Sequence, residues 1–140
     1  MVKLAVENNS KFEVSDIEFK RDGKSYTYLT IKELFNLFEI DEKIYFIIGT
    51  DAFEKIETWY EIDKLKELVK FIVFIREDNF EISRYDYLKD KGFDFEFQQL
   101  SYQDISSTEI RQTLSEGGDI ACYVAQEVKE YILKNELYKN

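Results

Sequence analysis

The most informative absence from this 140-residue chain is histidine, of which there is none. Histidine is the commonest general base and the commonest transition-metal ligand in proteins, so the sequence predicts neither a histidine-based catalytic site nor a histidine-ligated metal centre. Cys122 is the only cysteine, which excludes an intrachain disulfide and a cysteine-ligated zinc site. We therefore predict no catalytic side chain and no metal-ligand set within this chain.

Long apolar runs and excess positive charge are also missing. No stretch approaches the ~20 apolar residues that span a bilayer, and the first residues do not form a signal-peptide pattern. We therefore expect a cytoplasmic protein with no membrane partner. The net charge of -10 opposes contact with a nucleic-acid backbone, so no nucleic-acid partner is expected. A small phosphorylated ligand is compatible with this charge, because one pocket can be positive in an acidic protein.

What is present favours a folded α/β domain. Hydrophobic residues make up 44% and aromatic residues 16% of the chain, which argues against disorder, and the length suits a single domain over residues 1–140. Nearly continuous apolar runs at 43–48 and 71–75 predict strands covered on both faces, as in a parallel sheet. Helical patterns between these runs predict a right-handed α/β unit.

Alternation of apolar and polar residues predicts two further strands. The first is expected at 12–19, and the second at 93–100, near a sheet edge with one polar face. Apolar residues at helical spacing predict the helices. These are expected at 1–8, at 28–38, from 52, at 62–69, as a short helix within 77–92, at 106–115 before Gly117-Gly118, and at 124–133.

The segment Ile105-Ser106-Ser107-Thr108-Glu109-Ile110-Arg111 is the strongest candidate for a ligand site. Ser106 and Glu109 have the spacing of a capping box, in which each side chain bonds a backbone N–H at the start of a helix. Arg111 follows closely, although the helix dipole disfavours a cation there. Two interpretations stay open: a capping box with a solvated arginine, or hydroxyls, N–H groups and a guanidinium that bind a phosphate.

Other candidates lie where strands are expected to end, because ligands of open α/β sheets bind beyond the carboxyl ends of the strands. Gly49 would let a ligand approach the backbone, and Asp51 either bonds ribose hydroxyls or caps the next helix. Arg76 either contacts phosphate or is solvated. Trp59, beside Tyr60, either stacks on an aromatic ligand or closes the core.

Taken in order, these segments resemble the carboxyl-terminal two thirds of a bacterial nicotinate-nucleotide adenylyltransferase. The resemblance covers nearly the whole chain. The motif from Ile105 to Arg111 is typical of nucleotidyltransferases broadly, whereas Ser25-Tyr26-Thr27 with Gly49-x-Asp51 and Trp59-Tyr60 indicates the nicotinate-mononucleotide branch. The matching motifs are Gly23-x-Ser25-Tyr26-Thr27, Tyr45-Phe46-Ile47-Ile48-Gly49-x-Asp51, Trp59-Tyr60, Phe71-Ile72-Val73-x-x-Arg76, Ile105-Ser106-Ser107-Thr108-x-Ile110-Arg111 and Val128-x-x-Tyr131-Ile132.

The resemblance implies a Rossmann-like nucleotidyltransferase fold and transfer of the adenylyl group of ATP to nicotinic acid mononucleotide (NaMN), with Mg²⁺ accompanying ATP. By this resemblance, Trp59 would stack on the pyridine ring and the backbone around Thr27 and Tyr60 would receive its carboxylate. Gly49 and Asp51 would contact the nucleotide. ATP would be held by Arg76, Ile105, Ser106, Ser107, Thr108 and Arg111.

The family also has an amino-terminal His-x-Gly-His motif, and this chain contains no histidine. We therefore expect a partial domain that lacks the first two strands of the fold, with an uncovered edge on the strand at 44–48. Alone, such a chain should show no adenylyl transfer and should self-associate, unless an amino-terminal portion of the same fold covers that edge. A phosphopantetheine adenylyltransferase and a noncatalytic nucleotide-binding module are the alternative functions.

Overall fold

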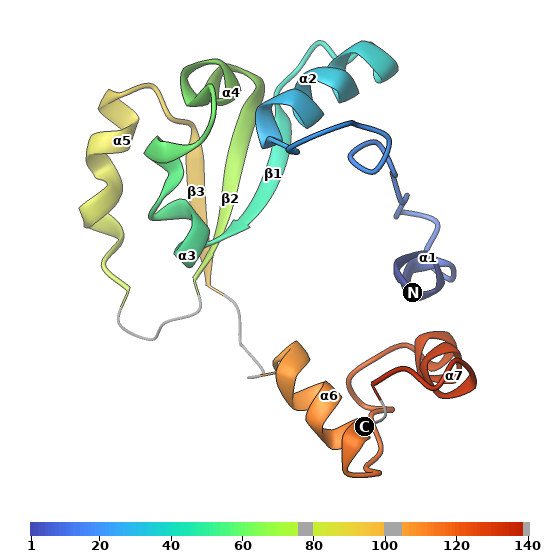
Figure 1. Ribbon diagram of the computed structural model, residues 1–140. Helices are drawn as coiled ribbons and strands as arrows, with labels where there is room; N and C mark the ends of the chain where they lie inside the picture. The colour runs from blue at the N-terminus through green and yellow to red at the C-terminus, as the bar shows by residue number, and fades with distance from the viewer. Residues whose placement is uncertain (76–79, 100–104, 139–140) are drawn as a thin grey trace. The chain divides into compact units, whose positions relative to one another are not determined.

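The computed structural model describes residues 1–75, 80–99 and 105–138. Within these residues the chain forms two compact units (Figure 1). We call the unit over residues 17–102 the sheet unit. The unit made of residues 1–16 and 103–140 contains helices and is called the helical unit. Among the described residues, no helix has both the length and the apolar character needed to cross a bilayer.

The sheet unit contains a parallel sheet in the order β1-β2-β3 (Figure 1). The strands are β1 (Ile44–Gly49), β2 (Val69–Ile75) and β3 (Phe95–Gln99). Ile48 pairs with Val73 in the β1–β2 ladder, and Val73 pairs with Phe97 in the β2–β3 ladder. The predicted α/β class with a parallel sheet is confirmed, as is the placement of the strand at 93–100 near an edge. Residue 100 lies outside the described residues.

Short helices connect the strands. α2 (Thr27–Phe38) precedes β1, while α3 (Thr50–Phe53), a 3₁₀ turn (Ile56–Thr58) and α4 (Ile62–Leu68) lie between β1 and β2. A second 3₁₀ turn (Ile82–Tyr85) and α5 (Asp86–Asp90) lie between β2 and β3. Both connections contain helices between parallel strands, as the predicted α/β unit requires.

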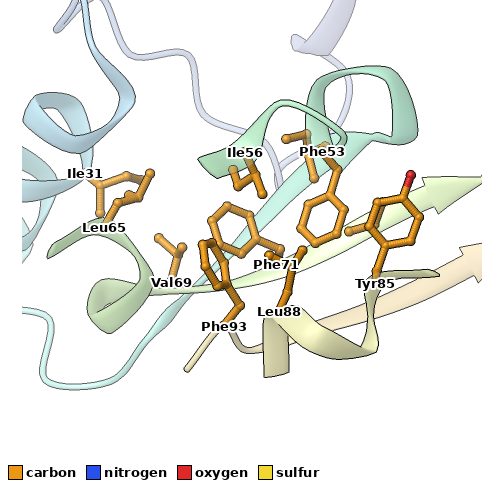
Figure 2. Packing of buried hydrophobic residues seen from close by; sticks show 11 residues of the cluster. Ile31, Phe53, Ile56, Leu65, Val69, Phe71, Tyr85, Leu88 and Phe93 are labelled. Carbon is orange, nitrogen blue, oxygen red and sulfur yellow. The ribbon is translucent and has the colours of Figure 1, made fainter. Parts of the chain in front are cut away.

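One face of β2 is the centre of the core. Burial alternates along this strand, with Val69, Phe71, Val73 and Ile75 buried. The fully buried ring of Phe53 lies 5.2 to 6.0 Å from the rings of Phe71, Tyr85, Phe95 and Phe97, in tilted or edge-on geometry. Figure 2 shows the core side chains converging on this face. The core comprises Ile31, Ile48, Phe53, Ile56, Leu65, Val69, Phe71, Val73, Tyr85, Leu88 and Phe93.

The opposite face of β1 is open, which corrects the prediction that this strand is covered on both faces. Tyr45 and Ile47 are 66% and 64% exposed, while Ile48 on the other face is buried. An apolar run makes a strand suitable for burial on both faces. Whether both faces are buried depends on which helices or strands pack against them. The expectation of an uncovered edge is confirmed for the part of the chain described, where β1 has one neighbour, β2.

The predicted strand at 12–19 is wrong, because these residues form turns and irregular backbone. Phe12 and Phe19 are 63% and 94% exposed, and Ile17 is buried. The alternation that suggested a strand is interrupted by acidic residues, and no described strand pairs with the segment. A single strand leaves its backbone groups without a ladder, so an irregular conformation that bonds locally or to water is preferred.

The helical unit consists of α1 (Val2–Val6), α6 (Ser107–Ser115) and α7 (Gln126–Lys134), which confirms three predicted helices with shifted boundaries. Its buried residues are Ile120, Val128 and Ile132. α6 is followed by Gly117-Gly118 as predicted. Gly117 has φ of +77°, and a Cβ on Gly118 would lie 2.7 Å from Cγ2 and 3.0 Å from the carbonyl oxygen of Thr113, so both positions favour glycine.

Replacing Phe53 tests whether the aromatic cluster holds the sheet unit together. Phe53→Ala should lower the free energy of unfolding by about 3 to 5 kcal/mol, because it removes a fully buried ring and leaves a cavity. Urea unfolding followed through the fluorescence of the single tryptophan, Trp59, measures this loss. Phe19→Ala is the control, since Phe19 is 94% exposed, and a comparable loss in both variants would contradict the central role of Phe53.

Candidate functional site

The carboxyl end of β1 leads directly into α3 at Gly49-Thr50-Asp51. Gly49 occupies the N-cap position of α3, and Asp51 lies in the first turn with an exposed side chain. The interpretation of Asp51 as the helix cap is therefore wrong. Its carboxylate instead lies at the positive end of the helix, where a negative charge is favoured. The other interpretation, a polar contact with a ligand, stays a prediction.

A cavity of about 270 Å³ lies between the start of α2 and the turn before α4. We call it the aromatic pocket. Two chain segments far apart in the sequence form it, and the rings of Tyr26 and Tyr60 stack on each other with centroids 4.4 Å apart. Three predicted NaMN-binding residues are thus brought together. The lining residues are Ser25, Tyr26, Thr27, Thr58, Trp59 and Tyr60.

Trp59 serves the core and the pocket at once. Its half-buried indole meets the ring of Phe46 edge-on, with centroids 6.0 Å apart and planes at 89°. The backbone is set by the 3₁₀ turn, because the N–H of Trp59 donates to the carbonyl of Ile56 at 3.1 Å. The two interpretations of Trp59 are therefore not exclusive. A ring packed on one side and lining a cavity on another is well placed to hold a flat ligand.

The start of α2 supplies the polar side of the aromatic pocket. Tyr26 is the N-cap residue, and Thr27 is the first helical residue, so Thr27 is not the cap. No side-chain hydrogen bond caps this helix. The first N–H groups of a helix have no intrahelical partner, and they bind anions well. A carboxylate on a flat ring fits this combination of a helix start and aromatic walls.

The capping box at α6 is confirmed. The Oγ of Ser106 accepts from the N–H of Glu109 at 3.1 Å, and the N–H of Ser106 donates to Oε2 of Glu109 at 2.8 Å. Hydrogen bonding of the carboxyl with the side chain and the backbone N–H of Ser106 lowers the pKa of Glu109. Ser107 and Thr108 are exposed in the first turn. The three-residue spacing of Ser106 and Glu109 therefore correctly predicted the capping box at the start of this helix.

Arg111 has a partner that the sequence did not reveal. Its guanidinium carbon lies 5.7 Å from the centroid of the Tyr138 ring, a cation–π contact within the helical unit. A cavity of about 260 Å³ beside it is lined by Ser107, Arg111 and Tyr138, with apolar walls. We call it the arginine pocket. The apolar lining residues are Met1, Val2, Ala5, Ile110, Val124, Val128 and Ile132.

The structure groups the predicted ATP-binding residues only in part. Ser107 and Arg111 line the arginine pocket, whereas Ile105 lines a separate cavity of about 280 Å³ with Glu109 and Thr113. The segment is helical from Ser107, so residues four apart share a face and neighbours do not. Arg76 lies outside the described residues. Gly49 and Asp51 are not among the residues lining the aromatic pocket.

Two tyrosines beyond the predicted set line the aromatic and arginine pockets. Tyr26 lines the aromatic pocket, and its place in the Ser-Tyr-Thr triplet was a usable signal. Tyr138 lines the arginine pocket, but its separation from Arg111 in the sequence offers no local pattern. Among the residues described, no group of three His, Cys, Asp or Glu side chains could hold a metal ion.

Comparisons with known proteins agree with one another. The model of the Cytidylyltransferase-like family matches residues 1–113. The "Probable nicotinate-nucleotide adenylyltransferase" of Clostridium botulinum (strain Kyoto) is 38% identical over 99% of this chain and 71% of its own length. The protein of the same description from Fusobacterium nucleatum subsp. nucleatum is 42% identical over 94% of this chain and 68% of its own length.

Solved structures similar to this chain include an adenylyltransferase of the same kind. Plasmodium falciparum nicotinic acid mononucleotide adenylyltransferase superposes with a TM-score of 0.69 and 27% sequence identity, both in its complex with APC and in its complex with NaAD. The superposition covers 99% of this chain, and 72% and 71% of the two solved chains.

The capping box predicts how the stability of α6 depends on pH. Because Glu109 has a lowered pKa in the folded protein, its contribution is fully present above the ordinary carboxyl pKa and is lost as the pH falls through the lowered value. Amide hydrogen exchange of α6, corrected for intrinsic rates, should show this loss in the wild type and not in Glu109→Gln. Glu130→Gln on α7 is the matched control, and identical profiles in all three proteins would contradict the assignment.

Proposed function

Because the chain belongs to the nicotinate-nucleotide adenylyltransferase family, we propose that it serves the transfer of an adenylyl group from ATP to NaMN, a step of NAD biosynthesis that yields deamido-NAD and pyrophosphate. The observation that carries this proposal is the aromatic pocket, in which Thr27, Trp59 and Tyr60 lie together. The proposed location is the cytoplasm, a reducing compartment with which the exposed free thiol of Cys122 is compatible.

The aromatic pocket suits the pyridine carboxylate end of NaMN. Its volume of about 270 Å³ is just below the ~300 Å³ lower bound for pockets that bury a drug-sized ligand, so it fits a substituted ring better than a whole dinucleotide. The indole of Trp59 offers a flat apolar surface, and the backbone of Thr27 and Tyr60 can receive the carboxylate. A flexible thiol-bearing chain such as phosphopantetheine would use neither feature. Gly49 and Asp51 would contact the rest of the nucleotide.

ATP is assigned to the segment Ile105–Arg111, which includes the start of α6. The family resemblance also assigns Arg76 to ATP. The exposed N-terminal turn of α6, with Ser106, Ser107 and Thr108, presents hydroxyl groups and the positive end of a helix. Arg111 adds a guanidinium beside the arginine pocket. Mg²⁺ would arrive with the ATP phosphates, because the described residues bring no set of three ligands for it.

The contribution of these residues to the reaction is positioning. Phosphoryl and adenylyl transfer need little covalent help from a protein, since aligning the two substrates and neutralising phosphate charge lower most of the barrier. The aromatic pocket would fix the acceptor nucleotide, and α6 would fix ATP. The charge-neutralising part of the family's chemistry also involves the His-x-Gly-His motif, which this chain does not contain.

We also propose that the open edge of β1 accepts an amino-terminal portion of the same fold, or a second copy of this chain when that portion is not supplied. β1 is at the edge of the described sheet, and Tyr45 and Ile47 expose an apolar face beside it. Unpaired N–H and C=O groups along such an edge favour addition of another strand. Adenylyl transfer is proposed to require the amino-terminal portion.

Two substitutions test the assignment of the ligands. Trp59→Leu should weaken NaMN about tenfold and leave ATP unchanged, because it removes the stacking surface, a loss of about 1.4 kcal/mol. Arg111→Ala should weaken ATP far more than NaMN, because it removes a charge-assisted phosphate contact. Calorimetry with each ligand measures both effects, preferably with the amino-terminal portion present. Trp59→Phe keeps a ring and should bind NaMN better than Trp59→Leu. Equal losses for both ligands in Arg111→Ala would count against the assignment.

Sedimentation velocity tests the proposal for β1. The chain alone should self-associate as its concentration rises and show no adenylyl transfer, and Ile47→Lys should reduce the association by placing a charge on the open face. Ile82→Lys is the control, because Ile82 is 47% exposed in the connection between β2 and β3 and does not lie on β1. A well-folded, catalytically active monomer would refute the proposal.

A further inference from the structure

Tyr26 and Tyr60 connect the two segments that form the aromatic pocket. Tyr26 immediately precedes α2, and Tyr60 lies in the turn before α4. Their ring centroids are 4.4 Å apart and their planes differ by 28°, which is stacked geometry. Both rings are partly exposed, at 37% and 46%, so the pair is not a buried core contact. Both tyrosines line the pocket together with Thr27 and Trp59.

The identity of residue 26 does not serve the helix that it precedes. The N-cap position favours Ser, Thr, Asp or Asn, whose side chains accept a hydrogen bond from the first turn. Tyr26 makes no such bond, so it leaves that turn of α2 without a side-chain cap. A tyrosine at this position is therefore explained by its contact with Tyr60 and not by helix formation.

The turn that carries Tyr60 depends on contacts with neighbouring residues. The next residue, Glu61, has φ of +53° and ψ of +39°, a left-handed conformation that is uncommon for residues other than glycine. Such a conformation persists when the surroundings hold it. Lys64 pairs with the Glu61 carboxylate at 2.9 Å, and its ammonium lies 5.8 Å from the centre of the Tyr28 ring. The centroids of the Tyr28 and Tyr60 rings are 6.5 Å apart. The Tyr26 stack is thus one of a small set of contacts that fix this turn.

We propose that Tyr26 is a positioning residue for NaMN, acting through its stack on Tyr60. The stack fixes the spacing between the start of α2, which receives the carboxylate, and the turn of Trp59, which receives the pyridine ring. Without it, both halves of the pocket remain but their separation is no longer set. This inference rests on the proposed function of the aromatic pocket and assigns Tyr26 no direct contact with the ligand.

Tyr26→Ser is the informative variant, because serine is a good N-cap and should keep α2 stable while removing the stack. We expect NaMN binding to weaken about fivefold to tenfold, the size of a lost aromatic pair, with ATP binding unchanged. Tyr26→Phe keeps the ring and should bind NaMN like the wild type. Calorimetry with NaMN and with ATP, together with thermal unfolding, separates this specific effect from a general loss of structure. NaMN binding at the wild-type level in Tyr26→Ser, or equal weakening of both ligands, would overturn the proposal.

A double-mutant cycle with Tyr60→Leu tests the route of the effect. If Tyr26 acts through Tyr60, the loss in the double variant will be no larger than the greater single loss. Additive losses would show that Tyr26 acts independently of Tyr60, for instance by touching the ligand itself. That outcome would overturn the positioning role.

A measurement without ligand keeps this inference distinct from the proposed function. Trp59 is the only tryptophan, so quenching of its fluorescence by acrylamide reports how accessible the indole in the pocket is to the quencher. Quenching should rise in Tyr26→Ser and stay unchanged in Tyr26→Phe. No rise would overturn the inference whatever the binding result. A rise in a protein whose wild type does not bind NaMN would refute the proposed function while confirming that the stack holds Trp59 in place.

Discussion

The sheet unit depends on one buried face of β2, against which the ring of Phe53 is packed. Phe53 ends α3, a helix of four residues that begins directly after β1, so the position of this ring dictates how tightly the chain must turn at Gly49. The 3₁₀ turn that follows buries Ile56 in the same core and leaves Trp59 at its end. The aromatic pocket is therefore located by the core: packing brings the 58–60 segment to the start of α2.

Patterns of residues close together in the sequence were sufficient to predict several structural features. The three-residue spacing of Ser106 and Glu109 gave the capping box, because both bonds form between neighbours in the sequence. The apolar run at 71–75 gave β2, whose two neighbours and helical cover make it the most buried strand described. The resemblance of the ordered motifs supplied the family and three of the residues that line the aromatic pocket, Thr27, Trp59 and Tyr60. Sequence thus predicted the class of fold and the family, while the ligand contacts of these residues stay a prediction.

Features that depend on distant partners could not be predicted in this way. The run at 44–48 resembles that at 71–75, yet Tyr45 and Ile47 are exposed because no described element covers that face. The alternation at 12–19 lacked a neighbouring strand, and turns formed instead. The division of the 105–111 segment between two cavities follows from helical geometry combined with the positions of α1 and α7, which no motif specifies.

The contact between Arg111 and Tyr138 has an entropic consequence for the helical unit. Immobilising a free arginine side chain costs up to ~2 kcal/mol of rotamer freedom. A guanidinium already resting against a ring has given up part of that freedom before any anion arrives. An anion and the Tyr138 ring also share the same cation, so an anion that draws the guanidinium away releases the ring. The mobility of the Tyr138 side chain would then report whether an anion is bound at Arg111 of α6.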